Sequence, residues 1–165
     1  MPLVVEHAPH PTDEVRTLIN ELEAILSAEY PPEQRHGLSF EQIFQPHVRF
    51  FVACRDAVPL GCGGIALFPD FAELKRMYVR ETARGQGIAD AILARLEQEA
   101  REVGIGVVRL ETGTSQRAAI RFYERSGFRR CPAFGDYACM PHYAVATSAF
   151  FEKPLERDPR RRNRQ

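Results

Sequence analysis

The residues with the clearest chemical meaning lie in one short segment, Arg84-Gly85-Gln86-Gly87-Ile88-Ala89. An apolar run precedes it and a helical pattern follows it, so it predicts a turn between a strand and a helix. A helix start usually carries a capping side chain and acidic residues, but here the first carboxylate is that of Asp90. Gly85 and Gly87 leave the backbone N–H groups open, and consecutive N–H groups at a helix start bind anions. The segment therefore predicts a site for a phosphate-bearing ligand, to which Arg84 adds a positive charge.

Two common phosphate motifs are excluded. The segment lacks the third glycine and the acidic residue of a dinucleotide fingerprint, and it lacks the Gly-Lys-Ser/Thr sequence of a P-loop. A phosphate ligand other than NAD or a magnesium nucleotide is therefore indicated. The alternative, that these glycines only make a tight turn, stays open at this point.

Other catalytic chemistry has little support. The five histidines lack the spacing of metal ligands, and Cys139 with His142 is an isolated pair, so we expect no metal site. A G-x-S-x-G nucleophile elbow is absent from the sequence. The four cysteines include no C-x-x-C pair, and we expect them to be small core residues rather than a disulfide framework.

The apolar patterns predict a mixed α/β or α+β fold around one sheet, with a parallel crossover after strand 72–79. The expected strands are 3–5, 48–54, 60–68, 72–79, 105–110, 128–134 and 147–153. The expected helices are one that begins after Thr12 and ends at Pro31, a short one at 39–44 that Ser39 and Gln42 cap, and two at 88–103 and 116–126. Residues 27–38 are expected to form an exposed loop. Three glycines inside strand 60–68 (Gly61, Gly63 and Gly64) predict a bulge or a close backbone approach.

The composition describes one ordinary domain with a basic tail. The chain has 165 residues, 22 basic residues balance 22 acidic ones, and 44% of the residues are hydrophobic. We expect one domain at 1–155 and a disordered tail at 156–165, because this arginine-rich tail has no apolar residue to bury. No aromatic residue is interleaved with its arginines, so we expect no nucleic-acid partner. Without a leader pattern or an apolar run of about 18 residues, we expect no membrane association and a cytoplasmic location.

Three segments resemble motifs of the GNAT superfamily of N-acetyltransferases. Residues 84–89 resemble its Arg/Gln-x-x-Gly-x-Gly/Ala motif, with Ala89 in the second glycine position. Residues 73–79 resemble its fourth strand, and residues 119–128 resemble its second motif, A-x-x-x-Y-x-x-x-G-F. The order of elements is similar over residues 3–155, and Gln116 stands where many members have asparagine. The wider pattern is similar to small bacterial acetyltransferases, mostly of unassigned substrate.

The resemblance implies a fold, a co-substrate and a reaction. The fold would be α+β, with a mostly antiparallel sheet of six to seven strands, a splayed parallel pair and about four helices. Acetyl-CoA (coenzyme A) would be the co-substrate, and its acetyl group would pass to a primary amine of a small molecule or amino acid by direct attack in a ternary complex. The backbone of residues 84–89 would hold the pyrophosphate. The remaining implied cofactor contacts are Met77, Tyr78, Val79, Gln116, Ala119 and Tyr123.

The resemblance also implies catalytic residues. An alkylamine with a pKa of about 10.4 must lose a proton before it attacks, and Glu73 matches the general base of the histone-acetylating branch. Tyr123 matches the tyrosine whose phenol, of pKa about 10, can protonate a thiolate of pKa about 8.5. The alternatives are a salt bridge from Glu73 to Lys75 and a packing role for Tyr123.

The acceptor is harder to read than the cofactor. Tyr30 and His36 fall in the loop that this family places over the acceptor site, although they could equally be ordinary polar loop residues. Acetylation of a protein's lysine or N-terminus stays open, as does a non-catalytic role as an acyl-CoA sensor or interaction module. The sequence is compatible with a monomer or a homodimer.

Overall fold

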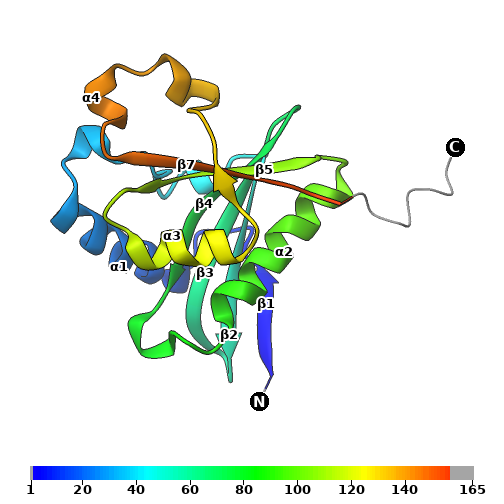
Figure 1. Cartoon of the computed structure of the whole chain (residues 1–165). Coiled ribbons are helices and arrows are strands. Elements are labelled where there is room, and N and C mark those ends of the chain that lie inside the picture. The colour runs from blue at the N-terminus through cyan, green and yellow to red at the C-terminus, as the bar shows by residue number, and fades with distance from the viewer. Residues whose placement is uncertain (1, 157–165) are drawn as a thin grey trace, which may run out of the picture.

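A computed structural model describes residues 2–156 and places seven strands in one sheet, in the order β1-β2-β3-β4-β5-β7-β6 (Figure 1). The strands are β1 (Leu3–His7), β2 (Val48–Arg55), β3 (Val58–Leu67), β4 (Ala72–Val79), β5 (Val107–Gly113), β6 (Arg129–Arg130) and β7 (Ser148–Pro154). The β4 and β5 pair is parallel and all other pairs are antiparallel. The predicted fold class is confirmed.

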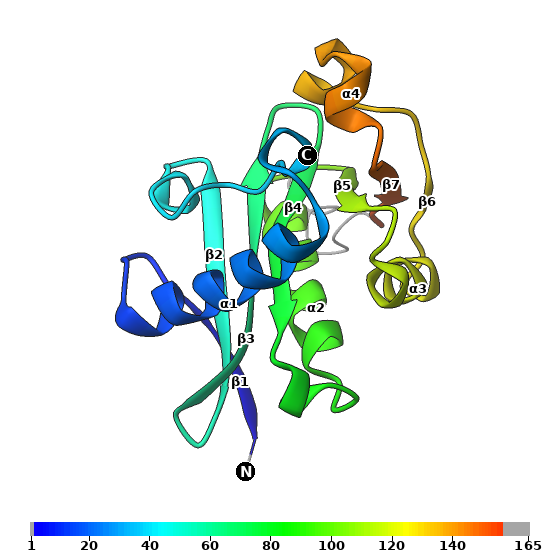
Figure 2. The same cartoon turned by 90° about the vertical axis from the view of Figure 1, so that its left-hand side faces the viewer.

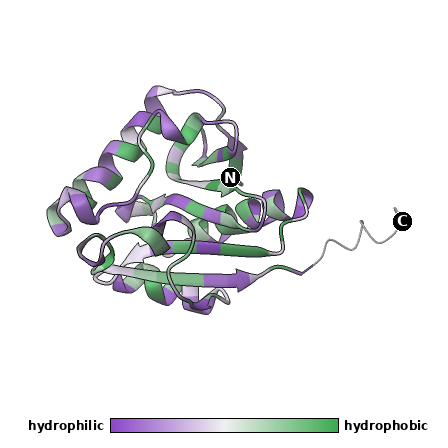
Figure 3. Cartoon of the chain, turned by 90° about the horizontal axis from the view of Figure 1, so that it is seen from above, coloured by the Kyte–Doolittle hydropathy of each residue, from purple (hydrophilic) through white to green (hydrophobic). Residues whose placement is uncertain are grey.

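Helices cover both faces of this sheet (Figure 2). They are α1 (Asp13–Glu29), α2 (Ile88–Glu102), α3 (Arg117–Arg125) and α4 (His142–Val145). The larger core contains apolar residues of α2 and Tyr123 of α3, whereas a second core packs α1 against β2 and β3. Polar and apolar residues alternate along the helices in Figure 3, as expected where one side of a helix packs against the sheet.

The first helix begins and ends where its sequence predicts. The side chain of Thr12 accepts a 3.2 Å hydrogen bond from the N–H of Val15, which caps the start of α1. Val15, Leu18 and Ile19 are buried in the second core. The helix ends at Tyr30 because Pro31 and Pro32 cannot continue it.

The parallel pair separates soon after it forms. β4 and β5 are paired only at Ala72 with Val108 and at Glu73 with Arg109, so beyond Glu73 the two strands have no shared ladder. On its other side β4 contains a bulge, where the register with β3 shifts and Arg76 adopts a φ of 56°. This is the splayed pair that the family resemblance implies.

The close approach predicted for the glycines of β3 is present at Gly63. A β-carbon there would lie 2.6 Å from Met77 Sδ and 2.8 Å from Ile92 Cγ2. A side chain at this position would therefore have to displace the side chains of Met77 and Ile92.

Two predicted elements are wrong in form. The reciprocal cap between Ser39 and Gln42 does form, at 2.9 and 3.2 Å, but it opens only a 3₁₀ turn at Gln42–Phe44 because Pro46 follows. The fourth helix is instead α4, which the sequence patterns did not reveal. The expected strand 128–134 shrinks to Arg129–Arg130, since Pro132 has no N–H to donate.

Other expectations need adjustment. The segment 27–38 is not simply an exposed loop, because Tyr30 is buried with 6% of its surface exposed.

All four cysteines are free, but only Cys62 is buried and Cys139 is exposed. No helix within residues 2–156 is long and apolar enough to cross a membrane. Most of the predicted basic tail, residues 157–165, lies outside the described residues.

Candidate active site

The glycine turn presents a row of open backbone N–H groups. It follows β4 and a 3₁₀ turn at Glu81–Ala83, and Gly85 and Gly87 adopt φ angles of 77° and 75°. Gly87 caps α2 without any side-chain hydrogen bond. Within residues 2–156, no acceptor meets the N–H groups of residues 85–90. A β-carbon on Gly85 or Gly87 would meet no atom within 4 Å, so space for a ligand is available.

Positive side chains lie beside these N–H groups. Arg84 Nε donates to the carbonyl of Val79 at 3.4 Å, and Arg55 Nη1 donates to Gln86 Oε1 at 2.6 Å. Arg55 comes from the end of β2, and the sequence motif gave no sign of it. Ile88 contributes only backbone here, because its side chain is buried in the larger core. This donor set fits the pyrophosphate of coenzyme A.

A cavity of about 140 Å³ lies where β4 and β5 separate. Residues of α1, β4, β5, α3 and the segment after α1 form its walls. Seven of the predicted site residues line it, namely Tyr30, His36, Glu73, Met77, Gln116, Ala119 and Tyr123. Tyr78 and Val79 do not, since Tyr78 packs against the α1 core and Val79 against the α2 core.

Glu73 is buried within a closed polar group. Its Oε2 lies 2.8 Å from Lys75 Nζ and accepts a 2.6 Å hydrogen bond from the hydroxyl of Tyr137. Lys75 Nζ also donates to that hydroxyl at 2.8 Å, so the three side chains form a triangle. The salt bridge named above as the alternative is therefore present. The contacts of Glu73 with Lys75 and with Tyr137 are both made through Oε2.

A second carboxylate, that of Glu111 on β5, lines the same cavity. Ser148 donates a 2.6 Å hydrogen bond to Glu111 Oε2. Burial raises the pKa of Glu111 above its usual range, and the hydrogen bond from Ser148 opposes this in part. The sequence prediction missed this residue because the expected strand ended at residue 110. A glutamate that directly continues an apolar strand was the available signal.

Tyr123 combines a packing role with access to the cavity. Its ring packs edge-on against Phe128, with centroids 5.7 Å apart, and belongs to the larger core. Burial, reinforced by the charge of Glu111, raises the pKa of Tyr123 above that of a free phenol. The phenol therefore stays protonated at neutral pH, as a proton donor requires.

Tyr30 and His36 are held by distant segments. The hydroxyl of Tyr30 accepts a 3.1 Å hydrogen bond from the N–H of Ser115, and Gly113 leaves the space that this hydroxyl occupies. The Nε2 of His36 lies 2.6 Å from the carbonyl of Ala144 in α4, so this nitrogen carries a proton. Gln116 donates to Glu29 Oε2 at 2.5 Å, which ties the start of α3 to the end of α1.

A larger hollow of about 600 Å³ adjoins the first cavity. Phenylalanines of the β3–β4 turn and of the segment before α4 line it. Both spaces share His36, Gly37, Glu73, Lys75 and Tyr137. The polar triangle therefore stands at the boundary between a small cavity beside Tyr123 and a wider opening.

Comparisons with known proteins agree with this geometry. The model of the acetyltransferase (GNAT) family matches residues 19–128. The chain is 41% identical over 145 residues to an IAA acetyltransferase of Azospirillum brasilense, covering 87% of this chain and 92% of that protein. It is 31% identical over 127 residues to the aminoalkylphosphonate N-acetyltransferase of Salmonella typhimurium, covering 72% of this chain and 79% of that protein.

Solved structures show the same fold. A candidate acyl-CoA N-acyltransferase from Klebsiella pneumoniae superposes with a TM-score of 0.73 at 32% identity, covering 93% of this chain and 98% of that one. The PaiA N-acetyltransferase of Thermoplasma acidophilum, solved in complex with coenzyme A, superposes with a TM-score of 0.71 at 19% identity, covering 94% of this chain and 100% of that one.

Proposed function

This chain belongs to the acetyltransferase (GNAT) family, which makes it an acetyl-CoA-dependent acyltransferase, and we propose that its acceptor is a primary amine of a small molecule or amino acid. Transfer occurs by direct attack while both substrates are bound. The observation that carries the proposal is that a single strand, β4, connects a cavity lined by two carboxylates and a buried tyrosine with the open N–H groups at residues 85–90, which follow the end of this strand.

The cofactor is held mainly by backbone. The N–H groups of residues 85–90 bind the pyrophosphate, with Arg84 and Arg55 adding positive charge. The pantetheine arm lies along the edge of β4 that β5 leaves unpaired after Glu73, with Met77 beside it. Backbone N–H groups near residues 77–79 polarise the acetyl carbonyl. Bound acetyl-CoA supplies an acetyl group activated as a thioester.

The amine must lose a proton before it attacks. Glu73 and Glu111 both line the cavity, and we place the acceptor nitrogen between them. Glu73 is engaged by Lys75 and Tyr137 through Oε2, and we assign its Oε1 as the proton acceptor. Glu111 is the second candidate, because its raised pKa makes its carboxylate a better proton acceptor. The pH–rate profiles of Glu73→Gln and Glu111→Gln identify the base. The variant that lacks the base should lose most activity below the pKa of the amine, and its rate should recover at high pH, where the amine is already neutral.

The departing thiolate needs a proton, and Tyr123 is the donor that we propose. Its raised pKa keeps the phenol protonated. Because a thiol of pKa about 8.5 is the stronger acid, Tyr123 first donates a hydrogen bond to the departing sulfur, and it gives up its proton only as the acceptor amine releases its own. The phenolate that results is restored by a proton from the acceptor side of the cavity.

A small acceptor is favoured over a polypeptide. The cavity beside Tyr123 holds about 140 Å³ and is bordered by α1, α3 and the segment that α4 anchors through His36. The names of two relatives, an IAA acetyltransferase and an aminoalkylphosphonate N-acetyltransferase, also refer to small molecules. The cytoplasmic location and the choice between monomer and homodimer remain predictions.

A thiol-release screen tests the proposed function. Purified protein with acetyl-CoA is offered amines, amino acids, polyamines and lysine-containing peptides, and free coenzyme A is measured. Release that depends on a small amine supports the proposal. Release with peptides alone would favour protein acetylation, and binding of acetyl-CoA without release by any amine would favour a sensor.

A further inference from the structure

We propose that the acceptor carries an acidic group, a carboxylate or a phosphonate, and that Arg76 and Arg35 bind this group at one end of the cavity. The inference rests on the proposed function and names its substrate class. It is carried by two buried guanidinium N–H positions without partners, both on side chains that line the cavity.

Arg76 is the better defined of the two. Its side chain is 5% exposed, its Nε donates to the carbonyl of Leu38 at 2.8 Å, and its Nη2 pairs with Glu23 Oε1. Its Nη1 is buried and has no hydrogen-bond partner. Because a buried charged donor without a partner costs free energy, this nitrogen is suited to an acceptor atom that a ligand brings.

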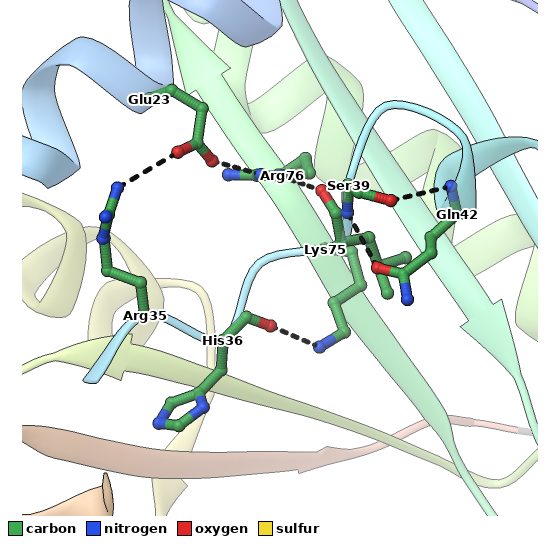
Figure 4. Close-up of polar contacts among 8 residues, drawn as sticks. Glu23, Arg35, His36, Ser39, Gln42, Lys75 and Arg76 are labelled. Atoms are coloured by element: carbon green, nitrogen blue, oxygen red, sulfur yellow. Dashed lines mark hydrogen bonds and ion pairs between the residues drawn. The ribbon is translucent and has the colours of Figure 1, made fainter. Parts of the chain in front are cut away.

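Arg35 has a similar unused donor. Its Nη1 lies 3.4 Å from Glu23 Oε2, while its buried Nε has no partner. Figure 4 shows Arg35 and Arg76 reaching the carboxylate of Glu23 from different sides. Two guanidinium groups thus share one carboxylate, which leaves one positive charge at this end of the cavity. An oxyanion would balance that charge and supply acceptors in the planar arrangement that guanidinium groups favour.

The position of Arg76 is fixed by the backbone around it. Arg76 sits in the β4 bulge with a φ of 56°, a conformation that is strained for a residue with a side chain. The backbone of Gly37 covers its guanidinium so closely that a β-carbon there would lie 2.6 Å from both Arg76 Cζ and Arg76 Nη1, so an acceptor atom must approach Nη1 from the side away from Gly37. This arrangement holds the charged group in place before any acceptor binds.

The two ends of the cavity carry opposite chemistry. Glu73 and Glu111 lie on the cavity wall near the separating strands, and Arg35 and Arg76 lie on the wall formed with α1. Lys75 next to Arg76 is already occupied by Glu73, so it does not compete for the acidic group. An acceptor with an amine at one end and an acid at the other would match both walls.

Matched acceptor pairs test the inference. Each pair differs only in the acidic group: an α- or ω-amino acid with its amide, and an aminoalkylphosphonate with the corresponding amino alcohol. The first readout is the melting temperature of the protein saturated with coenzyme A, which needs no turnover. The second is KM in thiol release. We expect at least one acid to raise the melting temperature more than its neutral partner and to have a KM at least about tenfold lower, as for one hydrogen bond to a charged group.

Three variants separate acid binding from a structural role. Arg35→Gln should raise KM for the acid at least about tenfold while KM for the neutral partner and for acetyl-CoA stays unchanged. Arg76→Gln should have the same effect if this variant folds. If it does not fold, Arg35→Gln alone tests the inference. Glu23→Gln is the control, because it removes the carboxylate that both arginines share but keeps every guanidinium donor. It should leave the preference for the acid intact or strengthen it.

The outcomes are distinct. The inference is overturned if no acid stabilises the wild-type protein more than its neutral partner, or if Arg35→Gln and Glu23→Gln weaken acid and neutral acceptors equally. Selective binding of acids without thiol release would contradict the proposed function and still support the subsite. Thiol release with neutral amines alone would support the proposed function and remove the subsite. Comparison of the phosphonate pair with the carboxylate pair identifies which acidic group the subsite binds.

Discussion

The hydroxyl of Tyr137 donates a 2.6 Å hydrogen bond to Glu73 Oε2, although the two residues are 64 positions apart. Tyr137 belongs to a 3₁₀ turn at Gly135–Cys139 before α4, and Glu73 lies on β4 at the point where β5 separates. Burial and the charge of Glu73 raise the pKa of Tyr137, so its hydroxyl remains a donor. This contact connects the segment before α4 directly to the candidate base.

Loss of that hydroxyl should destabilise the protein. Tyr137→Phe keeps the ring against Phe134 and Phe150 but leaves the buried carboxylate with Lys75 as its only partner in the described chain. We expect a loss of about 1.5 to 3 kcal/mol in the free energy of unfolding, measured by urea denaturation. Tyr143→Phe is the matched control, since Tyr143 is 63% exposed, and it should change nothing measurable. If the two variants were equally stable, the hydrogen bond from Tyr137 to Glu73 would not contribute to the stability of the protein.

Glu111→Gln should alter stability in a pH-dependent way. The pKa of Glu111 is raised in the folded state, so the folded protein holds this proton more tightly than the unfolded chain. The stabilisation from this tighter proton binding is therefore fully present below the pKa of Glu111 in the unfolded chain, about 4.3. It is lost as the pH rises through the pKa of Glu111 in the folded protein. The variant should melt above wild type at pH 8, and this advantage should vanish near pH 4.

The control for that experiment is Glu124→Gln, at an exposed position of α3. It should show no comparable change between the two pH values. A Glu111→Gln protein that melts below wild type at pH 8 would mean that the carboxylate is stabilising there, contrary to the effect of its burial.

Tyr123→Phe should separate binding from turnover. The substitution keeps the ring in the core and removes a hydroxyl that has no hydrogen-bond partner among residues 2–156. We expect acetyl-CoA to raise the melting temperature as in wild type, while kcat falls about 10²- to 10⁴-fold because the thiolate loses its proton donor. Turnover at the wild-type rate would instead make Tyr123 a packing residue.

Gly113→Ala should disturb the wall of the cavity. A β-carbon at position 113 would collide with the hydroxyl of Tyr30, which is buried and bonded to Ser115. We expect a loss of about 1 to 3 kcal/mol in stability, together with a higher KM for the acceptor. Gly106→Ala is the control, because a β-carbon there meets no atom within 4 Å. If both alanine variants behave alike, Tyr30 does not depend on this space.

Local sequence patterns predicted the conformation of the glycine turn better than the arrangement of side chains around the cavity. The turn at residues 84–89 is a continuous segment whose glycines and missing cap are visible in the sequence. Thr12 and the paired prolines 31 and 32 likewise fix the ends of α1 through contacts within a few residues. Such features can be predicted from the sequence because the residues that interact are neighbours in the chain.

The acceptor side depends on contacts between distant segments. Glu23 of α1 meets Arg76 of β4, and Tyr137 meets Glu73, through side chains that no periodicity connects. The short helix α4 has four residues, and its place is marked by the contact of Ala144 with His36 rather than by a pattern of its own. The bulge that turns Arg76 toward Glu23 lies opposite Gly63 of β3, but β4 itself contains no glycine that would place the extra residue at Arg76. These features follow from packing, which a single sequence does not display.

The most direct test of the central claim is the melting temperature of wild type, Gly87→Asp and Gly87→Asn with and without acetyl-CoA. Both substitutions place a side chain on a residue with a φ of 75°, which asparagine and aspartate tolerate better than most residues, and only aspartate adds a negative charge beside the open N–H groups. At 100 times the dissociation constant, acetyl-CoA should stabilise wild type by about 2.7 kcal/mol, or roughly 5 to 10 °C. We expect no such rise for Gly87→Asp and a reduced rise for Gly87→Asn. A wild-type protein whose melting temperature does not respond to acetyl-CoA would contradict the account.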